Sequence, residues 1–413
     1  MDVAVASIDI TPEFNVQLYG YESRKNRKTR KVLDPLYLQG IALRDGQHEF
    51  FILVFDLCLF DETISARLHA ELQRLGIARD QAFISCTHTH CGPVCSYNPI
   101  FRGNPMPYIE FVIPRMHTIV EELRNHYIQD CTTSYGEGTT RVPKNRTNQA
   151  GITEANPNGD IDPVVNVVSF TTPDNELLAI IFRASVHPTL LEDIMQISAD
   201  LPGSARKHLL EKLAGQMVPS PKSLPVVVFL QGFCGDANPI SRGSVDILES
   251  LGNQLADETF KIINNNLVRL DAVLNYHLDY LEVPCDAGAG TKKVAAVRKA
   301  LNRGKFQLVT KFTWPIHVLQ IAKNTLIIGC GGEIVHEIAE MVRNIFADFN
   351  VVLVGYTGEY HVYIPAENHF RLDSYEAIGV IKYTNLAGPI DRRGLNERLS
   401  SKFASIHEIV KTW

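Results

Sequence analysis

The chain has 413 residues, of which 45% are hydrophobic and 21% charged, and this composition is ordinary for a folded globular protein. Its formal net charge of -6 argues against a general nucleic-acid binder, which usually carries a basic face. The first residues lack the basic and apolar segments of a signal peptide, and no apolar run approaches the ~20 residues of a membrane helix. We therefore expect a cytoplasmic protein without stable membrane association.

One stretch near the start departs from this charge balance. It contains the basic residues Arg24, Lys25, Arg27, Lys28, Arg30 and Lys31. We interpret it as a solvated loop, and the alternative is that it meets an anionic substrate. The eight cysteines are scattered along the chain and form no CxxC pair, so we expect reduced thiols and no structural zinc site.

Hydrophobic periodicity predicts alternating strands and helices. In chain order, the expected strands cover residues 50–55, 82–87, 164–170, 177–184, 224–230, 325–329 and 351–355. The expected helices cover residues 62–75, 108–123, 204–213, 244–264 and 334–346. This alternation predicts an α/β fold with a mixed β-sheet core flanked by helices. We expect one domain over residues 1–413, without internal repeats and with a soft boundary near 284–291.

The strongest local motif is a pair of histidines, His88 and His90, directly after the strand predicted over 82–87. Side chains two positions apart on a strand point the same way, so we expect both imidazoles to leave the sheet edge together. This arrangement suits a metal ion, or one ligand beside a general acid or base. The alternative is a pair of hydrogen-bonded core histidines.

Two more candidates stand after the strand predicted over 177–184. His187 ends this apolar stretch and precedes a proline, and strand ends are where α/β folds collect their sites. Asp200 lies in a turn before the next helix, and we interpret it as a helix cap or as a carboxylate that supports a ligand.

The turns after two later strands carry carboxylates and an amide. Asp236 and Asn238 follow the strand predicted over 224–230 in a glycine-containing turn. Glu333 lies between a strand and a helix, where it could cap the helix or bind a metal ion. We interpret His336, three residues later, as part of the helix surface.

Three tyrosines, Tyr356, Tyr360 and Tyr363, surround a turn that contains glycines. Either all three are packing residues, or one of them places its phenol oxygen on a metal ion that acts as a Lewis acid.

These motifs occur in the same order in one known family. The sequence resembles the catalytic N-terminal domain of neutral (non-lysosomal) ceramidases over nearly its whole length. The matching segments are Ala6-Ser7-Ile8-Asp9-Ile10-Thr11-Pro12, Leu18-Tyr19-Gly20-Tyr21, Asp34-Pro35-Leu36-Tyr37, His88-Thr89-His90-Cys91-Gly92-Pro93, Asn145-Arg146, Asp162-Pro163, His187, Gly235-Asp236, Gly332-Glu333 and residues 360–365.

The resemblance implies a zinc site. In this reading His88 and His187 supply zinc nitrogens, Glu333 supplies a carboxylate oxygen, and Tyr363 supplies a phenol oxygen, with Tyr360 as the alternative. Three or four protein ligands beside an open position are typical of catalytic zinc.

The resemblance also implies roles in amide cleavage by zinc-activated water. His90 or Asp236 would assist proton transfer. Tyr360, Tyr363 or Asn238 would stabilise the oxyanion that develops on the substrate carbonyl.

The sequence departs from the family pattern at two positions of the site. The family has a serine that takes part in cleavage where this chain has Asn238, and an amide can donate a hydrogen bond but cannot act as a nucleophile. A second serine is replaced by Cys91, whose thiol is either a nucleophile or a small buried residue. Because the sequence ends at Trp413, we also expect the family's separate C-terminal domain to be absent.

We therefore expect a zinc-dependent hydrolase of an amide or lactam bond in a small soluble substrate. One alternative is a true ceramidase. The other is a non-catalytic zinc-containing binding protein, which the asparagine at position 238 motivates.

Overall fold

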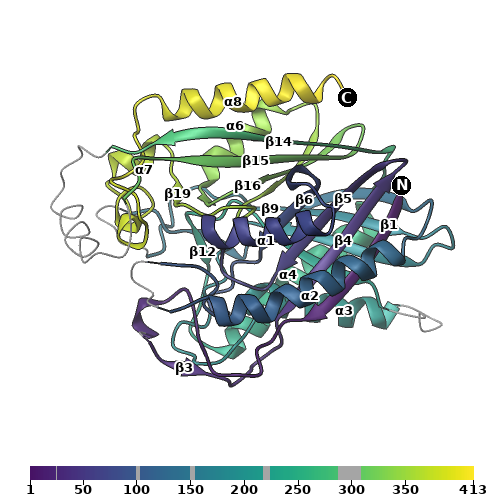
Figure 1. Ribbon diagram of the computed structural model, residues 1–413, viewed down its shortest axis with the longest axis horizontal. Helices are drawn as coiled ribbons and strands as arrows, with labels where there is room; N and C mark the ends of the chain where they lie inside the picture. The colour runs from purple at the N-terminus through teal and green to yellow at the C-terminus, as the bar shows by residue number, and fades with distance from the viewer. Residues whose placement is uncertain (25, 99–102, 149–153, 217–223, 287–307) are drawn as a thin grey trace.

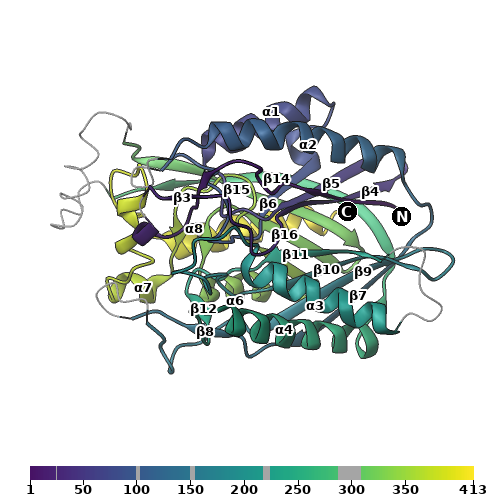
Figure 2. The same cartoon turned by 90° about the horizontal axis from the view of Figure 1, so that it is seen from below.

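The computed structural model describes residues 1–413 apart from 25, 99–102, 149–153, 217–223 and 287–307 (Figure 1). Lys25 of the basic stretch and residues 287–291 of the expected soft boundary lie outside the described residues. Mixed strands form the core and helices cover it (Figures 1 and 2), which confirms the predicted α/β class. Among the described residues, no helix is both long and apolar enough to cross a membrane.

Three sheets of four or five strands carry the fold. The first has the order β1 (Asp2–Asp9), β4 (Tyr37–Asp45), β5 (His48–Phe55) and β6 (Ala82–Cys86). The second has the order β11 (Val226–Gln231), β10 (Leu177–Ala184), β9 (Val164–Thr171), β7 (Thr132–Thr139) and β13 (Val268–Arg269). The third has the order β14 (Ala272–Pro284), β15 (Lys311–Ala322), β16 (Thr325–Cys330) and β18 (Asn350–Val354). Each sheet is antiparallel except for one parallel pair, namely β5–β6, β10–β11 or β16–β18.

Each parallel pair is connected through a helix, so one unit recurs in the three sheets. The connecting helices are α1 (Glu62–Arg74), α3 (Asp200–Gln216) and α6 (His336–Ile345). A second helix lies beside each of them, and these are α2 (Met106–Asn125), α4 (Val245–Asn265) and α8 (Leu395–Val410). Figures 1 and 2 show each helix pair on the outer side of its own sheet. The sequence analysis expected no internal repeat, and the recurrence is indeed one of topology, with different residues in each unit.

Four hydrophobic clusters hold these layers together. Three of them lie between a sheet and its own helix pair. The fourth lies where the three sheets face one another and includes Phe50, Ile181 and Leu319, one from each sheet. Because both faces of the central strands are buried, these strands are continuous apolar runs, which is why residues 50–55 and 224–230 could be predicted as strands.

Short strand pairs link the loops at the ends of the large sheets. These pairs are β2 (Val16–Gln17) with β3 (Lys28–Thr29), β8 (Pro143–Asn145) with β12 (Ala237–Pro239), and β17 (Glu333–Ile334) with β19 (Tyr363–Ile364). The pairing of β17 with β19 places Glu333 opposite Tyr363. A short helix, α7 (Glu367–Arg371), follows β19. Segments that are far apart in the sequence are thereby fixed beside one another at this end of the molecule.

The predicted elements agree with the structure in most places. The helices predicted over 62–75, 108–123, 244–264 and 334–346 correspond to α1, α2, α4 and α6, and the hairpin predicted over 164–170 and 177–184 corresponds to β9 and β10. The strand predicted over 82–87 ends one residue earlier, at Cys86. All eight cysteines are described and all are free, as expected.

Candidate metal centre

Segments that leave the three large sheets meet at one place. His88 follows β6, His187 follows β10, and Glu333 follows β16. Each of these strands belongs to the parallel pair of its sheet, and α/β folds place their ligand sites at the carboxyl ends of such strands. One side chain from each sheet thus reaches the same buried position.

The three side chains converge closely. Nε2 of His187 lies 3.0 Å from Nε2 of His88 and 3.0 Å from Oε2 of Glu333, and this oxygen lies 3.5 Å from Nε2 of His88. None of the three residues is more than 4% exposed. Donor atoms around one zinc ion, with bonds of about 2.0–2.2 Å, lie about 3.0–3.6 Å apart. The structure therefore brings three of the four predicted ligands to the mutual spacing of metal ligands.

The hydrogen bonds of both rings leave the right atoms available for a cation. Nδ1 of His88 lies 2.8 Å from the carbonyl oxygen of Cys58, and Nδ1 of His187 lies 3.0 Å from that of Cys234. A carbonyl oxygen only accepts, so each Nδ1 carries the proton and each Nε2 presents a lone pair. Two lone pairs and the Glu333 oxygen, which has no hydrogen-bond partner, then face one another. A divalent cation between them removes this repulsion, so the donor set fits Zn²⁺.

The protonation states of the site also favour a bound cation. Burial, together with the nearby Arg146, lowers the pKa of His187 to about 4. Burial opposes ionisation of Glu333, but the neighbouring His88 and His187 outweigh it and hold the carboxyl pKa well below its usual range. A neutral imidazole and an ionised carboxylate are the protonation states that metal binding requires.

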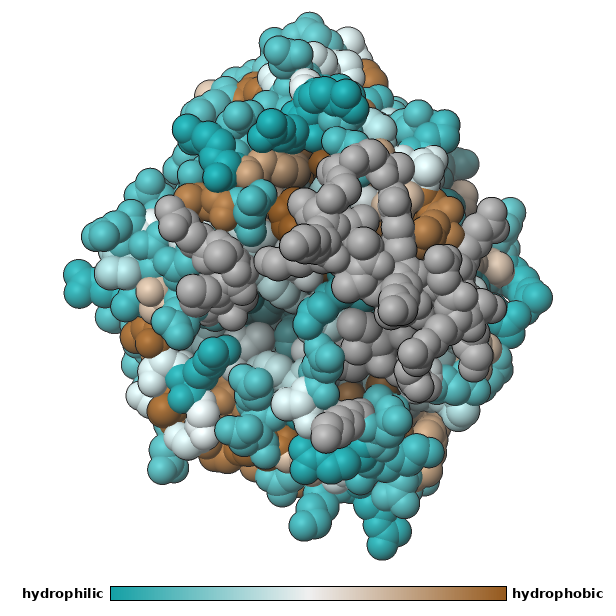
Figure 3. All heavy atoms as spheres, turned by 90° about the vertical axis from the view of Figure 1, so that its left-hand side faces the viewer, coloured by the Kyte–Doolittle hydropathy of each residue, from teal (hydrophilic) through white to brown (hydrophobic). Residues whose placement is uncertain are grey.

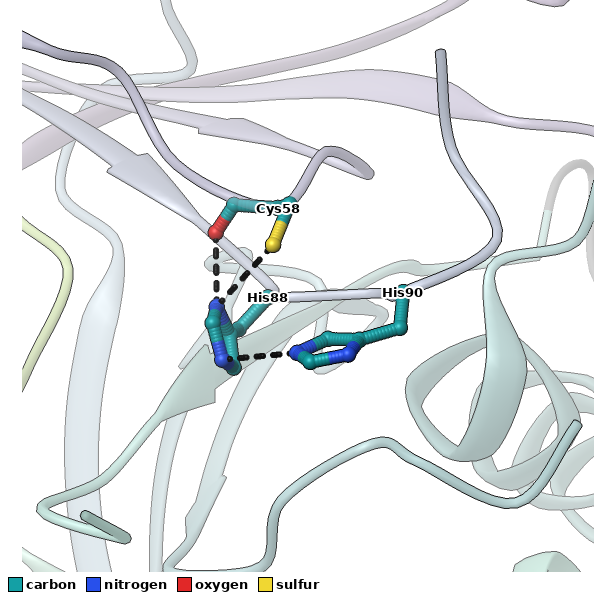
Figure 4. Close-up of side chains that lie close together, drawn as sticks. All are labelled: Cys58, His88 and His90. Atoms are coloured by element: carbon teal, nitrogen blue, oxygen red, sulfur yellow. Dashed lines mark hydrogen bonds between the residues drawn. The ribbon is translucent and has the colours of Figure 1, made fainter. Parts of the chain in front are cut away.

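The two histidines of the HxH motif meet for a reason other than the predicted one. Strand alternation does not align them, because β6 ends at Cys86 and His88 has a left-handed backbone with φ of 66°. The N–H of Thr87 donates to the carbonyl of Phe55 at the end of β5, and the N–H of His88 donates to the carbonyl of Leu57, and these hydrogen bonds hold the turn. Nε2 of His90 nevertheless lies 3.1 Å from Nε2 of His88 (Figure 4). Such a backbone costs about 1–3 kcal/mol for a non-glycine residue and is typical of functional sites.

The three tyrosines take different places. Tyr356 stacks on the ring of His88, with ring centres 3.9 Å apart. Burial and the nearby Glu333 raise the pKa of Tyr360 well above its usual range, and the hydroxyl of Tyr363 accepts a hydrogen bond from Arg146 at 2.9 Å. Tyr360 and Tyr363 both line the cavity at the convergent histidines. The phenol predicted as the fourth ligand therefore lies at the site, already engaged by a guanidinium.

Arg146 organises this side of the site, and the sequence analysis gave it no role. It is buried and donates to Oδ1 of Asn238 at 3.0 Å and to the carbonyl of Gly235 at 2.7 Å. Its Nε lies 3.2 Å from the carboxylate of Glu376. The only sequence signal for Arg146 was its place in a segment that matched the ceramidase family. Asn238 thus reaches the site through Arg146 and the hydroxyl of Tyr363.

Asp236 lies outside the cavity that the convergent histidines line. Its Oδ1 accepts from the backbone N–H of His336 at 3.0 Å, and its Oδ2 lies 2.5 Å from Nδ1 of the same residue. The interpretation of His336 as helix surface is wrong, because the residue is only 6% exposed. The first turn of α6 turns this ring inward against Asp236, and apolar periodicity cannot reveal a buried polar contact of this kind.

One residue of the basic stretch departs from the expected solvated loop, whereas Arg27, Lys28, Arg30 and Lys31 are exposed as expected. Arg24 is buried, and its guanidinium donates to the carbonyls of His90 and Leu191 and contacts Sγ of Cys91 at 3.3 Å. This arginine therefore supports the loop that carries the two histidines. Cys91 is fully buried, and burial raises its thiol pKa to about 12, which favours the interpretation of a small buried residue over a nucleophile.

Asp200 is the first residue of α3 and is also buried. Its carboxylate accepts hydrogen bonds from the N–H groups of Leu190 and Leu201. This holds the segment after His187 in place, in agreement with a supporting role.

Two small cavities adjoin at the site. One, of about 70 Å³, is lined by His88, His90 and Glu333 together with tyrosines. The other, of about 120 Å³, shares Tyr19, Asn98, Tyr360 and Tyr383 with the first, and its described lining contains no aliphatic side chain. Among the described residues that Figure 3 shows on the face at this end of the molecule, most are hydrophilic and the hydrophobic ones form separate groups.

Solved structures share this architecture. A crystal structure of neutral ceramidase from Pseudomonas aeruginosa matches with a TM-score of 0.76 over 98% of this chain and 74% of that chain, at 18% sequence identity. This chain has the neutral ceramidase fold. A second structure, a ceramidase complexed with C2, matches with a TM-score of 0.75 over 98% of this chain and 75% of that chain, at 16% identity. The sequence matches no protein-family model and no curated protein. The resemblance stated from the motifs is thus confirmed as a neutral-ceramidase-like fold.

Proposed function

We propose that the chain is a zinc-dependent hydrolase that cleaves a C–N bond of amide type in a small soluble substrate. The observation that carries this proposal is the convergence of His88, His187 and Glu333 inside a neutral ceramidase fold. Two imidazoles and one carboxylate are a common ligand set of catalytic zinc, which keeps a further position open. The chemistry that zinc supplies at such a site is Lewis-acid activation of water and of the substrate carbonyl.

His90 is the residue placed to move a proton. Its Nε2 lies 3.1 Å from the ring of His88, and its Nδ1 has no hydrogen-bond partner among the described residues. A neutral imidazole at this position accepts a proton from the attacking water and delivers it to the leaving nitrogen. Asp236, the other candidate for this role, is instead bound to His336, so we assign it to support of the loop.

Donors for the developing oxyanion come from the opposite wall. The hydroxyls of Tyr360 and Tyr363 border the cavity, and Arg146 fixes the second of them. Arg146 also occupies Oδ1 of Asn238, so the amide of this residue is oriented by the same guanidinium. Donors that are fixed before the reaction stabilise the transition state without reorganisation.

The size and lining of the cavities support a small polar substrate. The described walls around the convergent histidines are mainly tyrosine, asparagine and acidic side chains, and Leu59 and Val380 are the only aliphatic residues among the described lining. Such walls satisfy the hydrogen bonds of a polar molecule but offer little apolar surface to a long acyl chain. We therefore favour a soluble amide or lactam over ceramide.

The proposal is tested by metal content and by turnover measured together. Purified protein is analysed for zinc and assayed against a panel of small N-acyl compounds, lactams and a labelled ceramide. We expect about one zinc per chain, cleavage of small amides, and loss of both zinc and activity in His88→Ala and His187→Ala. The matched control is His126→Ala, which removes an exposed histidine and should change neither quantity. Protein that holds no zinc, or that keeps full activity without His88, contradicts the proposal, and ceramide as the preferred substrate contradicts its substrate class.

A further inference from the structure

A cysteine that the sequence analysis assigned to no site lies in the metal pocket. Cys58 follows β5 by three residues and is 1% exposed. Its Sγ lies 3.5 Å from Nδ1 of His88, while its backbone carbonyl accepts the hydrogen bond from that nitrogen (Figure 4). Cys58 lines the same cavity as His88, His90 and Glu333. Its thiol therefore borders this cavity from the Nδ1 side of His88.

Two overlapping sets of donor atoms describe this place. One set is His88, His187 and Glu333, and the other is Cys58, His88 and His90. Within each set, all donor atoms lie within 4.8 Å of one another. The sets share His88, whose Nδ1 already donates to a carbonyl. Only Nε2 of this ring can bind a metal ion, so a donor of the second set can share only the one ion that His88 binds.

A second observation points to a cation at this position independently of the thiol. Glu333 is 4% exposed, and its Oε2 faces the imidazoles without any hydrogen-bond partner. A buried ionised oxygen in this state is costly unless a positive charge lies beside it.

The other buried thiols of this region are engaged differently. Sγ of Cys95 lies 3.1 Å from the carbonyl oxygen of Leu59, and Sγ of Cys234 lies 3.2 Å from the hydroxyl of Tyr356. Cys234 is otherwise the counterpart of Cys58, because its carbonyl accepts from His187 and its Sγ lies 3.6 Å from the same ring nitrogen. Only Cys58 of this matched pair lines the cavity.

We propose that the thiolate of Cys58 is a protein ligand of the metal ion, beside His88, His187 and Glu333. Because Sγ now lies beside Nδ1 of His88, binding would require the Cys58 side chain to rotate about its Cα–Cβ bond, and the thiol would lose its proton to solvent when the metal is bound. Sulphur selects borderline and soft cations, so the site prefers Zn²⁺, Co²⁺ and Cd²⁺ to Mg²⁺ and Ca²⁺. This inference rests on the metal site of the proposed function and names the donor that sets its metal preference.

The test uses cobalt as a spectroscopic probe. Metal-free protein is titrated with Co²⁺ and its absorption is followed, because a cobalt–thiolate bond gives a charge-transfer band in the near ultraviolet. We expect this band in the native protein and in Cys234→Ser, and its loss in Cys58→Ser, which still binds one Co²⁺. Cys58→Ser should also lower the affinity for Cd²⁺ about tenfold or more, since the soft donor is removed. A native protein that binds Co²⁺ without the band, or a band that persists in Cys58→Ser, overturns the inference.

A measurement on the native protein covers the case in which Cys58→Ser fails to fold. Zinc X-ray absorption of the native protein should require one sulphur atom among the ligands. A coordination sphere of nitrogen and oxygen alone overturns the role of Cys58 but leaves the proposed hydrolase intact. Failure to bind any divalent cation overturns both.

Discussion

Two buried clusters of histidine and carboxylate in this molecule have similar composition and opposite chemistry. The first is His88, His187 and Glu333, and the second is Asp236 and Glu337 with His336 and His369. In the first cluster the Nδ1 atoms donate to backbone carbonyls. In the second, Nδ1 of His336 lies 2.5 Å from Oδ2 of Asp236 and 3.2 Å from Oε2 of Glu337.

The partner of Nδ1 decides what each cluster can hold. A carbonyl partner leaves the imidazole neutral with its other nitrogen free, and burial lowers the pKa of His187 to about 4. Burial also disfavours the charged form of His336, but the hydrogen bond and charge of Asp236 outweigh it and raise its pKa to about 9. The first cluster is therefore suited to a metal cation. In the second cluster, the positive charge of protonated His336 already balances the carboxylates.

The largest expected effect compares the glutamates of the two clusters. Glu333→Gln should lower zinc affinity by more than about a hundredfold, because even groups that only orient a ligand contribute about 10–100-fold. Glu337→Gln should leave zinc affinity within about twofold, because it alters the cluster that holds a proton. Competition with a chromophoric chelator measures both affinities. Similar losses in the two variants would show that the second cluster also binds the metal.

The next effect concerns the stability of the second cluster. Asp236→Asn leaves the buried imidazolium of His336 without its strongest counter-charge, and removing one partner of a buried pair costs about 3–5 kcal/mol. Urea denaturation should show a loss of this size in the free energy of unfolding, while about one zinc per chain is still bound. Loss of zinc with unchanged stability would instead place Asp236 in the metal site.

The sequence allowed good prediction of the residues that approach the metal position. His88, His187 and Glu333 could be singled out because each follows a buried strand, and strand ends are where side chains of α/β folds converge. Long apolar runs such as 50–55 and 177–184 also predicted their strands, since buried strands need no polar face. Position along the chain and apolar pattern are therefore enough to single out candidate residues, whereas their assignment to one zinc site came from the family resemblance.

The orientation of side chains could not be predicted in the same way. His336 was placed on the helix surface because its inward contact is with a carboxylate a hundred residues away. Cys58 and Arg146 carry no local signal, since a cysteine in an apolar run and an arginine in a loop are ordinary there. Which atom of an imidazole is free depends on tertiary hydrogen bonds, and these decide between a metal site and a proton site.

The pH dependence of stability separates the clusters further. The pKa of His336 is raised from about 6.5 when unfolded to about 9 when folded. The contribution of protonated His336 to the free energy of unfolding is therefore fully present below pH 6.5 and is lost as the pH rises through about 9. Native protein should lose about 2–3 kcal/mol of unfolding free energy between pH 6.5 and 10 relative to His336→Gln. Asp236 stays ionised throughout, because the hydrogen bond and charge of His336 outweigh burial and lower its pKa. If the free energy of unfolding changed with pH in the same way in both proteins, His336 would not be protonated in the folded protein.

The smallest expected effect tests the remaining member of the second cluster. Nε2 of the fully buried His369 lies 3.1 Å from the hydroxyl of Thr147. The substitution Thr147→Val keeps the shape of this side chain but removes its hydroxyl group. A neutral hydrogen bond contributes about 1 kcal/mol, so the free energy of unfolding should fall by about that amount. Zinc affinity should not change, because His369 belongs to the cluster whose charge is balanced by a proton. A drop in zinc affinity larger than the drop in stability would mean that the two clusters share one network, and the distinction by the partner of Nδ1 would then fail.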